Sequence, residues 1–232
     1  MKPYVLVIGH ACAAGEAPAN TLAGLRACLD CGAEAMEIDV QLCADGVPIL
    51  MHDDTVDRTT NLSGPVRERT LAELQAADAG AGEFVPTLDQ VLALAAGKLA
   101  PEQDPACVDA VVEVIRRHNA ESWTAIHSFN PVMVERARAT EPRVSATIIT
   151  GPVQGDLVDR LLGGLLKRDG QAISVEHHCV DRSLVEKAKR RQVSVWTWTV
   201  DNPDDWARVV EAGVDGIITN VPHKLREWLG AL

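Results

Sequence analysis

Short apolar runs rich in β-branched residues alternate with segments of helical periodicity along most of the sequence. This alternation is typical of βα units, in which helices cover both faces of a parallel sheet. It predicts strands at residues 5–10, 35–42, 47–52, 123–128, 144–150, 172–177, 193–200 and 216–220. It predicts helices at residues 21–31, 71–77, 88–95, 106–118, 131–139, 156–166, 182–190 and 204–212. An α/β fold built on one parallel sheet follows from this pattern.

The length of the chain narrows the fold further. Its 232 residues match a single (β/α)8 TIM barrel, which takes about 200 to 250 residues. We therefore predict one domain over residues 1–232. The third barrel strand has the weakest signal, because only Lys98, Leu99 and Ala100 look strand-like before Pro101. Either this strand is degenerate, or the sequence lacks residues near 100–101.

Charge and composition restrict the partners. A formal net charge of −11 and a scarcity of Tyr and Phe argue against a nucleic-acid partner, which needs a basic face or an aromatic platform. No apolar stretch approaches the roughly 20 residues of a membrane span, so stable membrane insertion is not expected. No signal peptide precedes the strand at residues 5–10, which predicts a cytoplasmic protein. The sequence leaves the oligomeric state open, a homodimer included.

Six cysteines are scattered along the chain, at positions 12, 28, 31, 43, 107 and 179. Cys28 and Cys31 have the Cys-x-x-Cys spacing, but no second pair accompanies them. Cys28 also lies within a predicted helix. We therefore expect small buried hydrophobic residues rather than a zinc site.

Polar residues stand where predicted strands end. The carboxyl ends of the strands of a parallel barrel converge on one open face, so such residues come together there. His10 ends the first strand, and His52 ends the segment 47–52. Glu37 and Asp39 are two residues apart in the second strand, so both carboxylates point to the same side. This set predicts a site for a hard cation, Mg²⁺ or Ca²⁺, with the two histidines as acid and base.

A purely structural role for these residues is the alternative. An isolated Glu-x-Asp pair is more often a solvated or ion-paired strand face, and a lone strand-end histidine is more often simply hydrogen-bonded. Here Glu37 and Asp39 alternate with Met36, Ile38 and Val40, and an unpaired charge buried in such a strand would be costly. The functional interpretation is therefore the stronger one.

The order of motifs resembles the glycerophosphodiester phosphodiesterases over nearly the whole chain. The N-terminal motifs are the most specific and comprise Gly9-His10, residues 17–25, 32–40 and 45–53, Asp57-Arg58-Thr59-Thr60-Asn61, Ser63-Gly64 and Val85-Pro86-Thr87-Leu88. Further matches are Ser128-Phe129 and residues 195–201 and 213–222.

The resemblance implies a TIM-barrel enzyme of lipid and glycerol metabolism that hydrolyses small glycerophosphodiesters to glycerol 3-phosphate and an alcohol. It implies that His10 and His52 are the general acid and base. It implies that Glu37 and Asp39 hold one divalent cation, Mg²⁺ or Ca²⁺. The substrate's own glycerol hydroxyl is the implied nucleophile, giving a cyclic phosphate that water then opens. Trp198 resembles the family's aromatic wall for the glycerol moiety, although a buried core tryptophan fits the pattern equally well.

Two charged positions of the family motifs are alanines here. The family's His-Arg-Gly reads His10-Ala11-Cys12, and its Pro-Glu-Asn-Thr reads Pro18-Ala19-Asn20-Thr21. The missing arginine would hold a phosphate oxygen through charge-assisted hydrogen bonds. Losing such a contact costs on the order of 2 to 5 kcal/mol, or roughly 30-fold to several-thousand-fold in rate. Ala11 and Ala19 therefore predict reduced activity, with a non-catalytic protein that binds a phosphodiester or glycerol phosphate as the alternative.

The family's third metal carboxylate and a nearby lysine come from the third barrel strand, so the third ligand is not assigned here. The candidates for it are Glu102, Asp104 and Glu176, of which Glu176 fits an ion-paired role equally well. Weaker candidates for substrate contact are His127, His177 and His178. Arg58 is expected to brace the loop that carries His52. A third reading keeps the barrel but makes it a lyase-type phospholipase, which needs a more apolar rim than these short loops predict.

Overall fold

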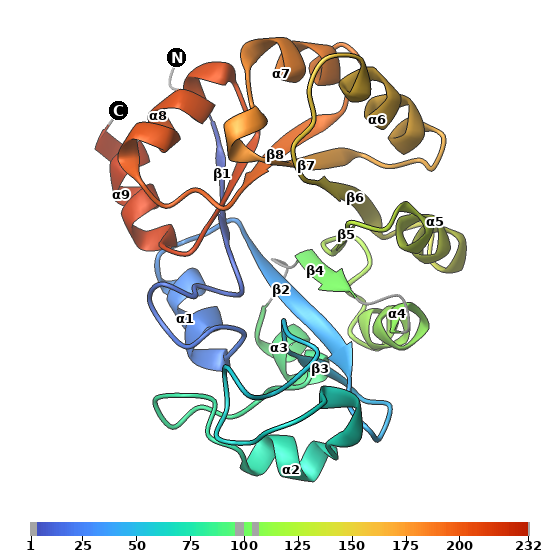
Figure 1. Cartoon of the computed structure of the whole chain (residues 1–232), viewed down its shortest axis with the longest axis vertical. Helices are drawn as coiled ribbons and strands as arrows, with labels where there is room; N and C mark the ends of the chain where they lie inside the picture. The colour runs from blue at the N-terminus through green and yellow to red at the C-terminus, as the bar shows by residue number, and fades with distance from the viewer. Residues whose placement is uncertain (1–3, 96–99, 104–106, 232) are drawn as a thin grey trace.

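The computed structural model describes residues 4–95, 100–103 and 107–231 (Figure 1). Within these residues, parallel strands alternate with helices that lie outside them (Figure 1). The parallel strands are β1 (Leu6–Gly9), β2 (Ala35–Leu42), β4 (Ala100–Gln103), β5 (Ala125–Ser128), β6 (Ser145–Thr150), β7 (Ala172–Glu176), β8 (Ser194–Trp198) and β9 (Gly216–Thr219). They lie in the order β1-β9-β8-β7-β6-β5-β4-β2, and β1 also pairs with β2, so the sheet closes on itself. The predicted TIM barrel is confirmed.

The alternation of β2 decides which of its side chains reach the barrel mouth. Met36, Ile38 and Val40 belong to the main hydrophobic core. Glu37 and Asp39 lie on the other face of the same strand, because successive side chains alternate. A strand buried on both faces therefore presents two carboxylates to one side and an apolar surface to the other.

The predicted strand at residues 47–52 forms, but it lies outside the barrel ring. β3 (Pro48–Leu50) pairs antiparallel with the end of β2. With η1 (Val66–Glu68) and α2 (Leu71–Ala76) it covers a small hydrophobic cluster of its own, at the bottom of Figure 1. The Met51 N–H donates to the Asp39 carbonyl at 3.0 Å. This hairpin therefore brings the next residue, His52, back towards the Glu37 and Asp39 carboxylates of β2.

The remaining helices pack around the ring and agree with the predicted pattern. They are α1 (Leu22–Asp30), α3 (Leu88–Ala95), α4 (Val108–Arg117), α5 (Pro131–Thr140), α6 (Asp156–Leu166), α7 (Arg182–Lys189), α8 (Pro203–Ala212) and α9 (Pro222–Ala231), with the short η2 (His177–Cys179) after β7. Asn130 and Asn202 cap α5 and α8, and a proline follows each cap. α9 is an addition to the predicted helices.

The third barrel strand is short but present. β4 runs parallel to both β2 and β5, and its register places Glu102 beside Asp39 on one side and His127 on the other. Residues 100 and 101 are part of this strand. Lys98, Asp104 and the side chain of Glu102 lie outside the described residues.

The cysteines behave as small hydrophobic residues. Cys12, Cys28, Cys43 and Cys107 are buried, and Cys31 and Cys179 are half-buried. Among residues 4–95, 100–103 and 107–231, no helix is both long and apolar enough to cross a membrane.

Candidate active site

The four residues predicted to carry the chemistry lie together at the carboxyl ends of the first strands. His10 follows β1 directly, Glu37 and Asp39 lie within β2, and His52 follows the β3 hairpin. All four line one cavity of about 100 Å³, called here the mouth cavity. Glu37 and Asp39 are 2% and 7% exposed, whereas the His52 side chain is 61% exposed. The cavity is thus lined by two buried carboxylates and by an accessible histidine.

The loop after β1 bends sharply against Glu37. Ala11 and Cys12 have φ values of 44° and 70°, in the left-handed region that non-glycine residues rarely adopt. Cys12 stands where the family motif has glycine, the residue for which this conformation is not strained. The bend lets the Ala11 N–H donate to Glu37 Oε2 at 2.9 Å and the Cys12 N–H donate to the Glu37 carbonyl at 2.9 Å. The turn therefore positions the Glu37 carboxylate.

Asn20 positions the second carboxylate. Its Nδ2–H donates to Asp39 Oδ2 at 2.7 Å, and its Oδ1 accepts from the Asp39 N–H at 3.1 Å. Asn20 is buried and has a φ of 56°, a conformation that asparagine tolerates better than most residues. This two-way contact sets the orientation of the Asp39 side chain.

A chain of hydrogen bonds sets the tautomer of His10. Asn220 donates from Nδ2 to Asp201 Oδ2 at 2.7 Å, so its Oδ1 is the atom that lies 2.8 Å from His10 Nδ1. An amide oxygen can only accept, which places the hydrogen on Nδ1 of His10. The Nε2 atom therefore carries a lone pair in the neutral ring and lies 3.9 Å from Glu37 Oε2.

A carboxylate and an arginine stand behind His52. His52 Nδ1 lies 2.7 Å from Asp53 Oδ1, and Arg58 donates from Nε and Nη2 to the two oxygens of Asp53 at 2.6 and 2.9 Å. The Arg58 hydrogen bond lowers the pKa of Asp53 to about 2. The hydrogen bond to the ionised Asp53 raises the pKa of His52, against the opposing effect of its own partial burial. The predicted brace from Arg58 to the His52 loop is present.

A larger cavity of about 230 Å³ adjoins the mouth cavity and shares His10, Asp39 and His52 with it. Ala11 and Ala19 both line it. The two positions at which the family motifs carry charged side chains therefore lie on one open space beside the histidines. We call this space the alanine cavity.

Two aromatic rings form a wall of the mouth cavity. Trp198, the predicted substrate-binding residue, donates from Nε1 to the Ser174 carbonyl at 3.2 Å. Its ring meets Phe129 edge-on, with centroids 5.6 Å apart and an interplanar angle of 88°. Ile149 and Ile218 complete this apolar side. The wall has the chemistry to pack against the carbon atoms of a small polyol.

His127 lies on β5 and also lines the mouth cavity. It is only 2% exposed, and neither ring nitrogen has a hydrogen-bond partner among the described residues. Burial, and secondarily the proximity of His10, lowers the pKa of His127 to about 3, so the ring is neutral. The sequence analysis made this residue a weaker candidate for substrate contact, and that contact stays a prediction.

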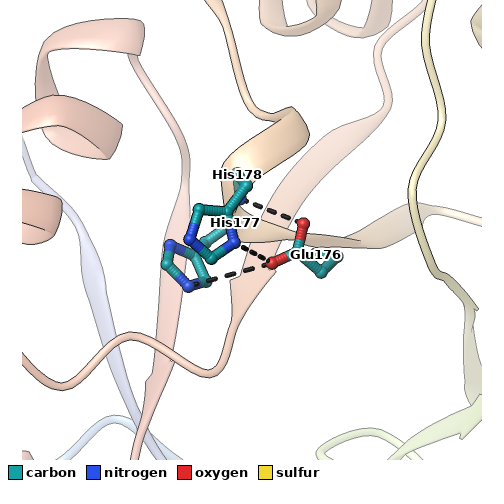
Figure 2. A group of neighbouring side chains, drawn as sticks. All are labelled: Glu176, His177 and His178. Atoms are coloured by element: carbon teal, nitrogen blue, oxygen red, sulfur yellow. Dashed lines mark hydrogen bonds and ion pairs between the residues drawn. The ribbon is translucent and has the colours of Figure 1, made fainter.

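Glu176, a candidate third metal ligand, is engaged with its neighbours instead (Figure 2). Its Oε1 lies 2.5 Å from His178 Nδ1, and its Oε2 accepts from the His178 N–H at 3.1 Å. These two residues and His177 offer ligand atoms within 4.8 Å of one another. However, Arg208 donates to His177 Nδ1 at 3.0 Å, which places the ring hydrogen on the Nε2 that faces Glu176. In this tautomer that nitrogen has no lone pair for a metal, and Glu176 contacts both histidines. Its role as a third metal ligand stays a prediction.

The donors at the barrel mouth fit a hard divalent cation. Glu37 and Asp39 are buried on the same strand face, where two negative charges are costly unless a cation offsets them. Carboxylate oxygens are the ligands that Mg²⁺ and Ca²⁺ prefer.

Sequence reasoning assigned no role to the residues that orient these groups. Asn20 and Asn220 lie inside the motifs on which the resemblance rests, yet their contacts span 19 and 210 positions of the chain. No local spacing reports a partner that far away. The position of Asn20 and Asn220 inside these motifs is the sequence signal that could have identified them.

Comparisons with known proteins identify the family of this chain. The sequence model of the glycerophosphoryl diester phosphodiesterase family matches residues 10–224. A glycerophosphodiester phosphodiesterase from Caldanaerobacter subterraneus subsp. tengcongensis is 33% identical over 95% of this chain and 96% of its own length. The crystal structure of a protein described as a glycerophosphoryl diester phosphodiesterase from Silicibacter pomeroyi DSS-3 superposes with a TM-score of 0.90 at 30% identity. The match covers 100% of this chain and 95% of that one.

A phosphodiesterase from Oleispira antarctica, solved in complex with its product sn-glycerol-3-phosphate, has a TM-score of 0.89 and 27% identity. The match covers 98% of this chain and 97% of that one. Family, relatives and fold agree over nearly the full length of the chain. The protein belongs to the glycerophosphoryl diester phosphodiesterase family.

Proposed function

We propose that this protein hydrolyses glycerophosphodiesters to glycerol 3-phosphate and an alcohol in a reaction that depends on one divalent cation. The observation that carries the proposal is the convergence of His10, His52, Glu37 and Asp39 on the mouth cavity. The product in the Oleispira antarctica structure supports the same class of product here.

Glu37 and Asp39 are the residues that would hold the cation, and their oxygen ligands suit Mg²⁺ or Ca²⁺. When bound, such a cation would supply charge that polarises the phosphoryl group and offsets the negative charge developing there. The chain keeps both carboxylates oriented, Glu37 through the Ala11 N–H and Asp39 through Asn20.

The two histidines have different partners and therefore different roles. His10 acts as the base, because Asn220 holds the hydrogen on Nδ1 and leaves the Nε2 lone pair to accept a proton from the glycerol hydroxyl of the substrate. His52 acts as the acid, because the ionised Asp53 favours its protonated form, which donates to the leaving alcohol. Attack by the hydroxyl gives a cyclic phosphate, and water opens it with the two roles reversed.

Trp198 is the proposed substrate-binding residue. Its ring and that of Phe129 line the mouth cavity together with the carboxylates and histidines that would act on the phosphodiester. The glycerol carbons would pack against this wall while the phosphodiester lies between the histidines.

Ala11 and Ala19 reduce the rate in this proposal rather than abolish it. The alternative is a binding protein without turnover. It is less favoured, because both histidines and both carboxylates keep their orienting contacts, and only the charge beside His10 is lost.

The test is release of glycerol 3-phosphate from glycerophosphocholine and glycerophosphoethanolamine, with Mg²⁺, with Ca²⁺ and with EDTA. Cation-dependent release from either ester supports the proposal. Binding of glycerol 3-phosphate without any turnover in either metal would favour the binding protein instead.

The metal assignment predicts that Glu37→Gln weakens Mg²⁺ binding at least about tenfold, because the carboxylate charge is lost from the site. Glutamine can still accept from the Ala11 N–H, so the fold should persist. Titration calorimetry with Mg²⁺ measures the affinity, and Glu113→Gln, an exposed site on α4, is the matched control. Equal Mg²⁺ affinities of the two variants would remove Glu37 from the metal site.

The role of His52 predicts a change in pH dependence in Asp53→Asn. An acid must be protonated to act, so kcat/KM falls as the pH rises through the raised pKa of His52. Removing the Asp53 charge lowers the pKa of His52, so the alkaline limb of the kcat/KM profile moves to lower pH. The same shift should appear when the His52 ring is titrated by NMR. An unmoved alkaline limb beside a lowered His52 pKa would show that His52 is not the acid.

A further inference from the structure

The alanine cavity lies beside the proposed site, yet the proposed reaction gives it no role. Its volume of about 230 Å³ is more than twice that of the mouth cavity. The two cavities share His10, Asp39 and His52, so they meet at the residues proposed to act on the phosphodiester. A phosphodiester has two ester arms, the glycerol and the alcohol that leaves. The structure therefore offers a separate cavity for each arm.

The walls of the alanine cavity are mostly small and apolar. Alanines at positions 11, 14, 19 and 79 line it, and Leu50 and Val85 add larger apolar side chains. Methyl groups contribute no hydrogen bond, and an unpaired charge held against them would be costly. Burial of carbon against such walls is favourable instead. The lining therefore favours an occupant whose body is made of carbon.

Polar residues also line the alanine cavity, but their polar groups contact other parts of the protein. Both polar ends of Asn20 contact one residue of β2. Arg58 donates from Nε and Nη2 to Asp53, and the Thr59 hydroxyl donates to the Met51 sulfur at 3.2 Å. None of the described residues on this cavity is Trp, Tyr or Phe, the side chains that hold a quaternary ammonium. The cavity thus suits an uncharged apolar group better than the cation of choline or ethanolamine.

We propose that the alanine cavity receives the leaving alcohol, and that this protein prefers glycerophosphodiesters whose leaving alcohol is uncharged and apolar. The inference rests on the proposed function. The glycerol arm packs on the Trp198 wall, and the alcohol arm enters the alanine cavity. His52 lines this cavity, so its proton goes to the departing oxygen as the bond from phosphorus to that oxygen breaks. Ala11 and Ala19 then change the substrate preference of the chain as well as its rate.

The first experiment measures kcat/KM for the ethyl, propyl and butyl esters of sn-glycerol 3-phosphate. These alcohols leave about equally well, so differences among the esters report the burial of carbon. Each buried CH₂ is worth about fourfold, so the parent should favour the butyl over the ethyl ester at least about fivefold. Ala79→Leu fills part of the cavity and should reduce this preference to within about twofold. Ala72→Leu adds the same carbons at an exposed position of α2 and should keep the preference.

The second experiment isolates charge with two esters of one shape. Glycerophosphocholine and the 3,3-dimethylbutyl ester differ in whether nitrogen or carbon carries the three methyl groups. The net charge of −11 attracts the cation, and the positive nitrogen makes choline the better leaving group, so both effects favour choline. The parent should nonetheless favour the dimethylbutyl ester at least about fivefold, because the cation loses its water against the apolar walls.

Failure of either preference in the parent would overturn the inference. So would an Ala79→Leu protein, folded by thermal melting, that keeps the full dependence on chain length. Ala19→Leu fills the same cavity from another position and repeats the test if Ala79→Leu does not fold.

Binding without turnover separates this inference from the proposed function. The 3-hydroxypropyl alkyl phosphates lack the attacking 2-hydroxyl, which blocks the proposed route to the cyclic phosphate. Calorimetry with the ethyl and butyl members should show tighter binding of the butyl member in the parent and loss of this difference in Ala79→Leu. A parent that shows this difference but hydrolyses none of the glycerol esters would overturn the proposed function and leave the role of the alanine cavity standing. A parent that hydrolyses the esters without preference would do the reverse.

Discussion

His52→Ala is expected to lower kcat/KM for glycerophosphodiesters by about 100- to 10,000-fold, the range for proton transfer by a positioned histidine. The residue lies at the edge of the mouth cavity, with Asp53 and Arg58 arranged behind it to favour its protonated form. No other described histidine on that cavity has an ionised carboxylate hydrogen-bonded to its ring, so none can replace it. The measurement is steady-state release of glycerol 3-phosphate at saturating Mg²⁺ and then Ca²⁺.

His118→Ala is the matched control for that experiment. His118 caps the end of α4 and contacts Asp89 at 3.1 Å, away from both cavities. Its replacement should leave kcat/KM within about threefold, because surface substitutions seldom disturb a distant site. Thermal melting should find both variants folded, since the His52 side chain is largely exposed. Equal losses in the two variants would place the chemistry elsewhere.

Ala11→Arg combined with Ala19→Glu is expected to raise kcat/KM at least about 30-fold, the lower end of the cost of losing a charged contact. A phosphodiester that approaches a protein of net charge −11 needs local positive charge, and Ala11 removes one source of it. The structure has room for the change, because both alanines line the alanine cavity of about 230 Å³. The backbone strain at a φ of 44° stays the same, since alanine and arginine both carry a Cβ.

Ala72→Arg with Ala76→Glu provides the matched control, because it adds the same two side chains at exposed positions of α2. This pair should leave kcat/KM unchanged within about twofold. A second arm adds millimolar guanidinium to the parent, where the alanine cavity should admit the ion and partly restore the rate. A folded Ala11→Arg, Ala19→Glu protein no faster than its parent would mean that the arginine is dispensable in this chain.

The barrel could be predicted because its signal is local. A buried parallel strand needs a short apolar run and a following helix needs a 3.6-residue period, and both can be read from neighbouring residues. β3 departs from this logic: its apolar run was predicted as a strand, but its antiparallel pairing with β2 depends on a hairpin that folds outside the ring. The sequence signal of β4 (Ala100–Gln103) is also weak. This short strand pairs with β2 and β5, and its own few residues give little sign of those pairings.

The sequence by itself determined that Glu37 and Asp39 share one side of β2, because alternation along a strand is a property of adjacent residues. It also placed His10 and His52 at strand ends. Only the tertiary structure decided which nitrogen of His10 faces the cavity, since Asn220 reaches it across 210 residues of chain. It alone brought Ala11 and Ala19 onto one open space and left His127 unpaired in the mouth cavity among the described residues. Burial, pairing and protonation depend on contacts between segments far apart in the chain, and local patterns carry no record of them.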